Sequence, residues 1–100
     1  IDARGRIGVA YYRCAFATDA SGSCPFGDDA LVFTWREPGG DWTTEVIDQG
    51  PEIGACGRNP SLVFAEQDGE TTAYVAYLCQ NLDGDGDLVD ELWVAARDTL

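Results

Sequence analysis

Histidine, methionine and lysine are absent from this 100-residue sequence, so all six basic residues are arginines. Without histidine or lysine the chain lacks the commonest general base, the amine of Schiff-base enzymes and the lysine of phosphate-binding loops. Ser21, Ser23 and Ser61 have no neighbouring base to activate them. We therefore expect no catalytic residues and a protein that is not an enzyme. The missing methionine indicates that Ile1 follows a processing step or lies within a longer chain.

Positive charge is scarce, because 18 acidic residues face six arginines and give a net charge of -12. Nucleic acids and anionic membrane surfaces attract basic proteins, so neither is expected as a partner. No apolar run approaches the roughly 18 to 20 residues that cross a bilayer, which argues against membrane insertion. The 45% hydrophobic content nevertheless indicates a folded chain. Cationic partners or metal ions fit this composition.

The four cysteines form no CxxC pair, and there is no histidine to complete a zinc site. In so short a chain they favour disulfides and an oxidising compartment, which is extracellular, at the cell surface or periplasmic. The alternative is a set of free thiols in the core of a cytosolic protein. Four cysteines allow three connectivities on paper.

Helical periodicity is also missing, whereas short β-branched and aromatic runs alternate with glycine, proline, aspartate and asparagine. The pattern predicts an all-β fold. Asp68 and Gly69 form a strong hairpin signal. Six strands are expected, at residues 7–14, 29–36, 42–48, 61–66, 72–79 and 90–97.

An internal repeat organises these strands. DALVFTWR at residues 29–36 recurs as DELWVAAR at 90–97 with an offset of 61, so that Leu31 matches Leu92. The run at 7–14 resembles that at 72–79, and within it Val9 and Tyr11 align with Val75 and Tyr77 at an offset of 66. If residues 61–66 are strand one of a four-stranded unit, the six strands in chain order are strands two, three and four of one unit, followed by strands one, two and three of the next. We therefore expect four-stranded antiparallel meanders within a single segment 1–100, with a partial unit at 1–48, a loop at 49–60 and a second unit at 61–100.

The repeat motif is a W-x-x-E-x-I-D strand from Trp42, a loop with Gly54 and Gly57, a Pro-Ser-Leu start at Pro60, a turn at Asp68 and V-A-Y strands. It resembles the repeat of sialidase-like β-propellers in bacterial secreted and surface proteins. The resemblance covers nearly the whole chain. It implies about one and a half propeller blades, whose partners are further copies of itself or the remainder of a longer propeller.

Three functions are compatible with this resemblance. The first is a non-catalytic extracellular propeller segment for binding, adhesion or assembly. The alternative is part of a propeller glycosidase, sialidase-like, or of a lectin whose key residues lie outside this chain. A third is an independent disulfide-stapled β-sandwich that binds a partner.

A sialidase needs an arginine cluster and a nucleophilic tyrosine, and residues of these types are present. The arginines at 36 and 97 recur at equivalent repeat positions, however, which indicates a structural role. The tyrosines lie in V-A-Y strands, where we expect them to pack. The residues concerned are Arg36, Arg97, Tyr11, Tyr74 and Tyr77.

The meander predicts the disulfide pairing. Strands one and two are antiparallel neighbours, so the start of strand one lies beside the end of strand two. Cys56 and Cys79 occupy these two places and should be bonded. Cys14 ends the first-copy strand as Cys79 ends the second, and Cys24 in the following loop is its expected partner.

An acidic stretch, NLDGDGDLVD at residues 81–90, supplies the candidate metal site. Calcium takes six to eight oxygen ligands, and alternating carboxylates separated by glycines can curl around it. The stretch resembles the calcium loops of integrin-type propellers. The alternative is a solvated acidic loop whose glycine and aspartate residues form turns. It lies on the face where the long loops open, the usual ligand face of propellers for a glycan or protein. The proposed calcium ligands are Asn81, Asp83, Asp85, Asp87 and Asp90.

Overall fold

The structure is a computed structural model that describes residues 1–14, 24–25 and 27–98. It confirms the all-β prediction, since its regular elements within these residues are six strands and no helix. They form two three-stranded antiparallel sheets, β1-β2-β3 (sheet A) and β4-β5-β6 (sheet B). The strands are β1 (Ile7–Cys14), β2 (Asp29–Arg36), β3 (Thr43–Gln49), β4 (Ala55–Gln67), β5 (Glu70–Leu82) and β6 (Leu88–Arg97).

Each sheet is a meander in which consecutive strands pair. Sheet A contains the expected strands two, three and four, and sheet B contains strands one, two and three. A complete four-stranded unit is not present among the described residues, so that part of the expectation stays a prediction.

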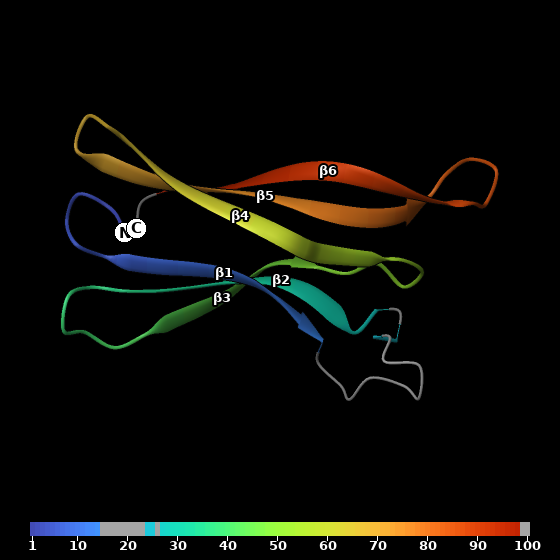
Figure 1. Cartoon of the computed structure of the whole chain (residues 1–100), viewed down its shortest axis with the longest axis horizontal. Coiled ribbons are helices and arrows are strands. Elements are labelled where there is room, and N and C mark those ends of the chain that lie inside the picture. The colour runs from blue at the N-terminus through green and yellow to red at the C-terminus, as the bar shows by residue number, and fades with distance from the viewer. Residues whose placement is uncertain (15–23, 26, 99–100) are drawn as a thin grey trace.

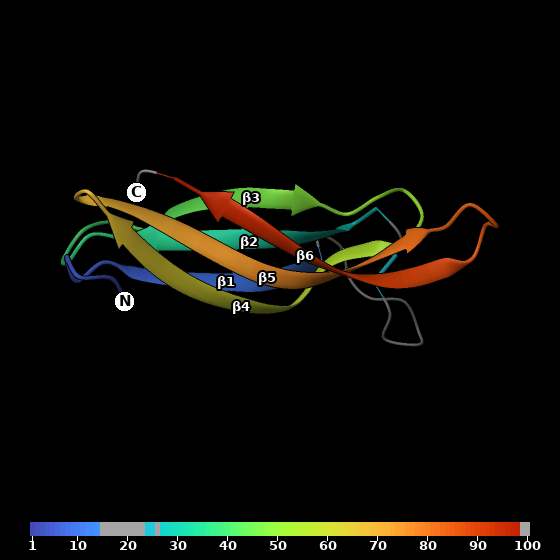
Figure 2. The same ribbon diagram turned by 90° about the horizontal axis from the view of Figure 1, so that it is seen from above.

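The two sheets stack face to face as the two layers of an elongated molecule with principal extents of 45 × 29 × 16 Å (Figure 1). Seen from above, β1 and β4 lie along one margin and β3 along the other, while β6 crosses the molecule obliquely and comes near β3 only at its C-terminal end (Figure 2). The main contacts between the layers run from β4 to β1 and β2. The core therefore lies between sheet A and sheet B, which are built from the repeated strands.

The core between the sheets is thin and centred on β2 and β5. In β5 every second side chain from Thr71 to Cys79 is buried, as expected for a strand with one covered face. Gly8 leaves space for the opposite layer, since a Cβ there would come within 2.5 Å of the Phe64 ring. The central cluster consists of Leu31, Cys56, Val75, Tyr77 and Cys79, with Ala10, Ile47, Leu62 and Ala95 packed against it.

The bounds of β3, β5 and β6 differ from the expected ones by at most three residues, and the start of β4 was wrong by six: residues 55–60, expected in the loop 49–60, already belong to β4. The pairing of β4 with β5 shifts register between Cys56 and Arg58 and again between Arg58 and Ser61. Gly57 and Asn59 have φ angles of 100° and 50° there. Residues that usually mark a loop therefore form bulges in an edge strand, which also tolerates Pro60.

Both predicted disulfides are confirmed, Cys14 with Cys24 and Cys56 with Cys79. Cys56 and Cys79 are direct cross-strand partners in β4 and β5, with 4.1 Å between their Cα atoms. The meander argument succeeds because antiparallel pairing fixes which strand ends are neighbours.

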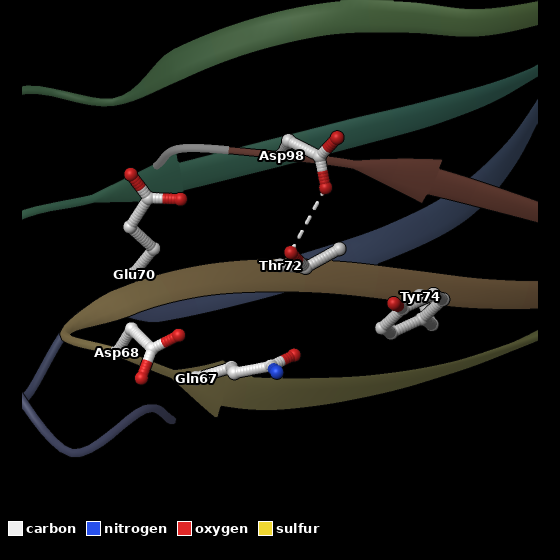
Figure 3. Close-up of a pocket in the computed structure, with 6 residues that line it drawn as sticks. All are labelled: Gln67, Asp68, Glu70, Thr72, Tyr74 and Asp98. Carbon is white, nitrogen blue, oxygen red and sulfur yellow. Dashed lines mark hydrogen bonds between the residues drawn. The ribbon is translucent and has the colours of Figure 1, made fainter.

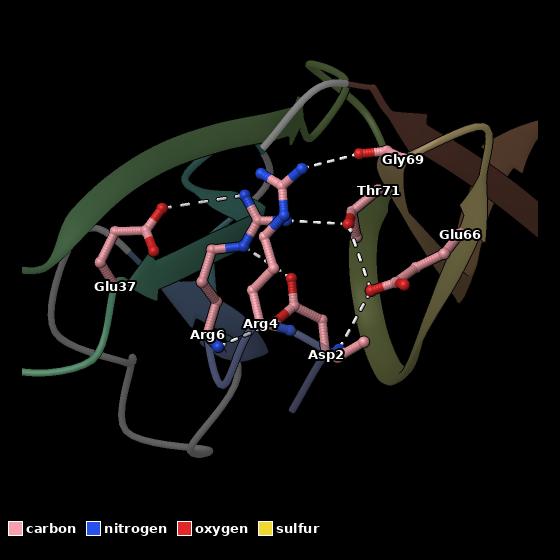
Figure 4. A network of polar contacts seen from close by, with 8 residues as sticks. Asp2, Arg4, Arg6, Glu37, Glu66, Gly69 and Thr71 are labelled. Atoms are coloured by element: carbon pink, nitrogen blue, oxygen red, sulfur yellow. Dashed lines mark hydrogen bonds and ion pairs between the residues drawn. The ribbon is translucent and has the colours of Figure 1, made fainter.

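A buried ion pair ties the N-terminal segment to sheet B (Figure 4). The side chains of Arg6 and Asp2 are 1% and 0% exposed, and Arg6 Nε donates to Asp2 Oδ2 at 2.6 Å. Arg6 Nη2 also donates to Thr71 Oγ1 in β5 at 2.8 Å. Next to this pair, Arg4 Nη2 donates to the carbonyl of Gly69 in the β4–β5 turn at 2.7 Å. The network thus joins the N-terminal residues that precede β1 of sheet A to the β4–β5 hairpin of sheet B.

Candidate functional site

The predicted metal ligands lie in and beside the hairpin turn between β5 and β6. Asp83 Oδ1 accepts hydrogen bonds from the backbone N–H groups of Asp85 at 2.8 Å and Asp87 at 2.9 Å. The Asp83 N–H donates to the Asp87 carbonyl at 2.8 Å, and Gly86 adopts a φ of 82°. Asp83 is therefore the residue that closes the turn, as aspartates often do.

Two of the remaining predicted ligands, Asn81 and Asp90, lie outside this turn. The amide of Asn81 donates to Glu91 Oε1 at 2.8 Å across the hairpin. Asp90 lies opposite Gln80 in the β5–β6 pairing and is exposed. The structure thus brings Asp83, Asp85 and Asp87 into one turn and leaves Asn81 and Asp90 in the strands that flank it.

Within the part of the chain that the structure describes, three possible ligand atoms gather within 4.8 Å only at Asp48, Cys56 and Cys79. Both sulfur atoms of this group are joined in a disulfide, so neither is a thiolate that could bind a metal. The Asp48 carboxylate accepts a hydrogen bond from the Tyr77 hydroxyl at 2.6 Å. Burial, together with this hydrogen bond, raises the pKa of Tyr77. The group is a structural contact between β3 and β5, and calcium binding at the hairpin stays a prediction.

A buried carboxylate at the first residue of β2 is the most unusual acidic group in the chain. Asp29 is 1% exposed, and its Oδ1 has no hydrogen-bond partner among the described residues. Burial raises the pKa of Asp29, although backbone hydrogen bonds at Asp29 and Cys56 and the charge of Arg58 oppose this shift. Gly50 packs directly on this oxygen, because a Cβ on Gly50 would lie 1.8 Å from it. The carboxylate is enclosed by protein and does not open into a ligand site.

This burial could not be read from the sequence. Asp29 and Asp90 are equivalent in the repeat, yet Asp90 is exposed on the outermost strand of sheet B. Nothing local distinguishes the two aspartates. What differs is the neighbouring layer, since β4 begins against the start of β2.

The acidic hairpin and the 50–54 connection lie at the same end of the molecule in both ribbon views (Figures 1 and 2). The β4–β5 turn, the N-terminus and the C-terminal end of β6 lie at the opposite end. The expected loop face also includes the β1–β2 connection, of which residues 15–23 and 26 lie outside the described residues, so the loop face stays a prediction.

A shallow polar hollow of about 470 Å³ lies at the end opposite the acidic hairpin (Figure 3). Among the residues that line this hollow, Thr72 Oγ1 donates a hydrogen bond to Asp98 Oδ1 at 2.9 Å. Its lining contains three carboxylates and no basic side chain, so it would suit a cationic group better than an anion. The lining residues are Gln67, Asp68, Glu70, Thr72, Tyr74 and Asp98.

The residues that a sialidase would need do not share a site. Tyr77 is 3% exposed in the core, whereas Tyr11 and Tyr74 are 37% and 39% exposed in strands of different sheets. Arg36 lies over the Trp42 ring, with 5.0 Å from Cζ to the ring centroid. Arg97 forms an ion pair with Glu45 of the other sheet at 2.8 Å. Both arginines have structural contacts, as the repeat indicated.

A membrane-spanning helix is not found among the described residues. No protein-family model matches the chain, and neither the curated proteins nor the solved structures contain a significant match.

Proposed function

We propose that this chain is a non-catalytic, extracellular β-propeller segment that serves binding, adhesion or assembly. The observation that carries the proposal is the way its two repeated sheets stack. They do not bury the same face of the repeat.

The buried face of sheet A contains Leu31 and Ala10, which pack on the central cluster. The repeat offsets match these residues to Leu92 and Ala76 in sheet B. Leu92 and Ala76 lie on the other side of sheet B from Val75 and Tyr77, because alternate residues of a strand point to opposite faces and Tyr77 pairs with Trp93. The matching face of sheet B therefore points away from sheet A.

The converse holds for the buried face of sheet B. Val75 and Tyr77 face sheet A, whereas their counterparts Val9 and Tyr11 lie on the outer side of sheet A. The two units are thus stacked front to back. A sandwich of two repeats related by a twofold axis would instead bury the same face of each.

Front-to-back stacking of meander sheets is how successive blades of a propeller pack, and it supports this function over an independent two-sheet sandwich. Two disulfides in 100 residues are consistent with an extracellular or periplasmic location. Among the described residues, strand one is missing beside β1 of sheet A and strand four is missing beside β6 of sheet B, and both β1 and β6 are edge strands that leave room for these further strands of complete blades.

Electron microscopy of the full polypeptide that contains this chain, combined with its mass in solution, tests the proposal. We expect disc-shaped particles with a central channel, formed by one long chain or by a ring of short ones. A compact monomer of about one 100-residue chain, unchanged over a hundredfold range of concentration, would contradict the propeller.

We also propose that the acidic hairpin binds calcium and stabilises this assembly. For a dissociation constant near 0.5 mM, 5 mM calcium would stabilise the folded chain by about 1.4 kcal/mol, or roughly 5–10 °C in melting temperature. The double variant Asp85→Asn/Asp87→Asn should lose this shift, while Asp41→Asn at a distant turn should keep it. An unchanged melting temperature at millimolar calcium would rule the site out.

A further inference from the structure

We propose that the outer face of sheet B binds the outer face of sheet A from a second copy of this chain. The inference rests on the proposed function, because it uses the front-to-back stacking of the two units. It adds which surfaces meet and which residues lie opposite one another.

The outer face of sheet B carries the counterparts of side chains that are fully buried in sheet A. Leu31 is 0% exposed, whereas its repeat counterpart Leu92 is 72% exposed. Phe33 is 0% exposed, and Val94 at the same offset of 61 is 65% exposed. The surface that sheet A buries against sheet B is therefore present again on sheet B, where nothing in the described chain covers it.

The outer face of sheet A shows the complementary half along β1, whereas Ala30 and Val32 of β2 on the same face are already 0% exposed. Val75 and Tyr77 are both 3% exposed where they meet sheet A. Their counterparts Val9 and Tyr11 are 43% and 37% exposed. Each of the two outer faces thus matches one side of an interface that already exists inside the molecule.

Large apolar side chains are concentrated on these two faces. Together with Val63, Tyr74 and Leu78 around Leu92 and Val94, the outer face of sheet B forms one continuous apolar surface. An apolar surface of this kind on a chain with a net charge of -12 is typical of an interaction site. The partner that fits it best is the surface already seen to pack on its equivalent, namely the outer face of sheet A.

The internal interface also predicts the contacts. Leu31 packs in one cluster with Val75 and Tyr77. By equivalence, Leu92 of one copy should meet Val9 and Tyr11 of the next. Such an interface joins two different surfaces, so repeated binding gives a closed ring or an open array and not a twofold dimer.

The interface should be weak for two separate chains. A face of three strands spaced about 4.8 Å apart and about 30 Å long covers roughly 450 Å², so both partners together bury about 900 Å². This lies below the roughly 1,200 Å² of stable complexes. Chemical cross-linking at high protein concentration is therefore the appropriate measurement.

Two single variants of the full chain, Leu92→Cys and Val9→Cys, test the inference with a short bis-maleimide. The four native cysteines are all in disulfides, so the new thiol is the only one that reacts. We expect the mixture to give at least tenfold more cross-linked dimer than either variant alone. The double variant should give a ladder of higher oligomers. Gly84→Cys, in the exposed hairpin with no atoms close to its Cβ position, is the matched control.

Two outcomes would overturn the inference. If Leu92→Cys alone cross-links as well as the mixture, sheet B binds sheet B and the front-to-back contact is wrong, although an assembly still exists. If the mixture yields no more dimer than Gly84→Cys, the two faces do not meet. The propeller proposal fails separately: ladders that form open filaments in electron micrographs would confirm the contact and contradict the closed ring.

Discussion

Replacing Arg6 with alanine is expected to lower the free energy of unfolding by about 3–5 kcal/mol, because a charge is left buried without its partner. In the native protein Asp2 and Arg6 are sealed from solvent, and their ion pair spans 2.6 Å. Removing the guanidinium also deprives Thr71 of a hydrogen-bond donor in the opposite layer. Urea unfolding followed by tryptophan fluorescence measures the effect.

The matched control is Arg4→Ala, two residues away. Arg4 is exposed and donates to one backbone carbonyl, that of Gly69, so its loss should cost about 1 kcal/mol or less. The double variant Asp2→Asn/Arg6→Met removes both charges and should recover part of the loss. Equal effects of Arg6→Ala and Arg4→Ala would show that the ion pair is not buried in solution.

The same pair predicts a pH dependence. Burial alone would raise the pKa of Asp2, but hydrogen bonds and charge from Arg6, with a backbone N–H of Arg4, outweigh it and lower the pKa. The contribution of Asp2 is therefore present above its unfolded pKa of about 3.9 and is lost as the pH falls through the lower folded value. Arg6→Ala removes the side-chain hydrogen bond and the charge but keeps the backbone N–H that donates to Asp2 Oδ1 at 2.8 Å, so it should reduce this acid-side loss, which unfolding curves between pH 2 and 6 would reveal.

Substitution of Gly57 with alanine is expected to destabilise the protein by about 3 kcal/mol or more, combining backbone strain with overpacking. Gly57 has a φ of 100°, and a Cβ there would lie 2.6 Å from the Leu31 nitrogen and 2.7 Å from the carbonyl group of Ala30. These are backbone atoms of a buried strand and cannot move aside cheaply. The bulge in β4 therefore requires glycine where it meets β2.

Gly69→Ala separates the two causes. Gly69 also has a positive φ, 79°, but no atom lies within 4 Å of its Cβ position. Its replacement should cost only the conformational penalty, about 1–2 kcal/mol. Thermal melts of both variants provide the comparison, and a similar loss for each would mean that the start of β4 does not press on β2.

The strand order and the disulfides could be predicted because both follow from local pattern. Alternating apolar residues mark the strands, the 61- and 66-residue offsets show that strand types recur, and a meander fixes which cysteines are neighbours. The turn at Asp68 and Gly69, with φ angles of 53° and 79°, has the hairpin geometry that its sequence indicates.

The features that escaped prediction depend on the second layer. Gly57 and Asn59 indicated a loop, and only the contact with β2 shows that they are bulges in a strand. The Asp2–Arg6 pair has an ordinary spacing that many exposed pairs share, and its burial arises from the β4–β5 hairpin. For the acidic hairpin, the sequence supplies the carboxylates, but the hydrogen bonds that engage Asp83 and Asn81 depend on the turn that forms.

Neither disulfide joins the two layers. Cys14 and Cys24 staple the β1–β2 connection of sheet A, and Cys56 and Cys79 staple the β4–β5 hairpin of sheet B. The only covalent link between the halves is the main chain that runs from Gln49 to Ala55. A single proteolytic cut in that segment would leave two stapled fragments held together by noncovalent contacts alone, and a pulling force on the two halves would meet no disulfide bond.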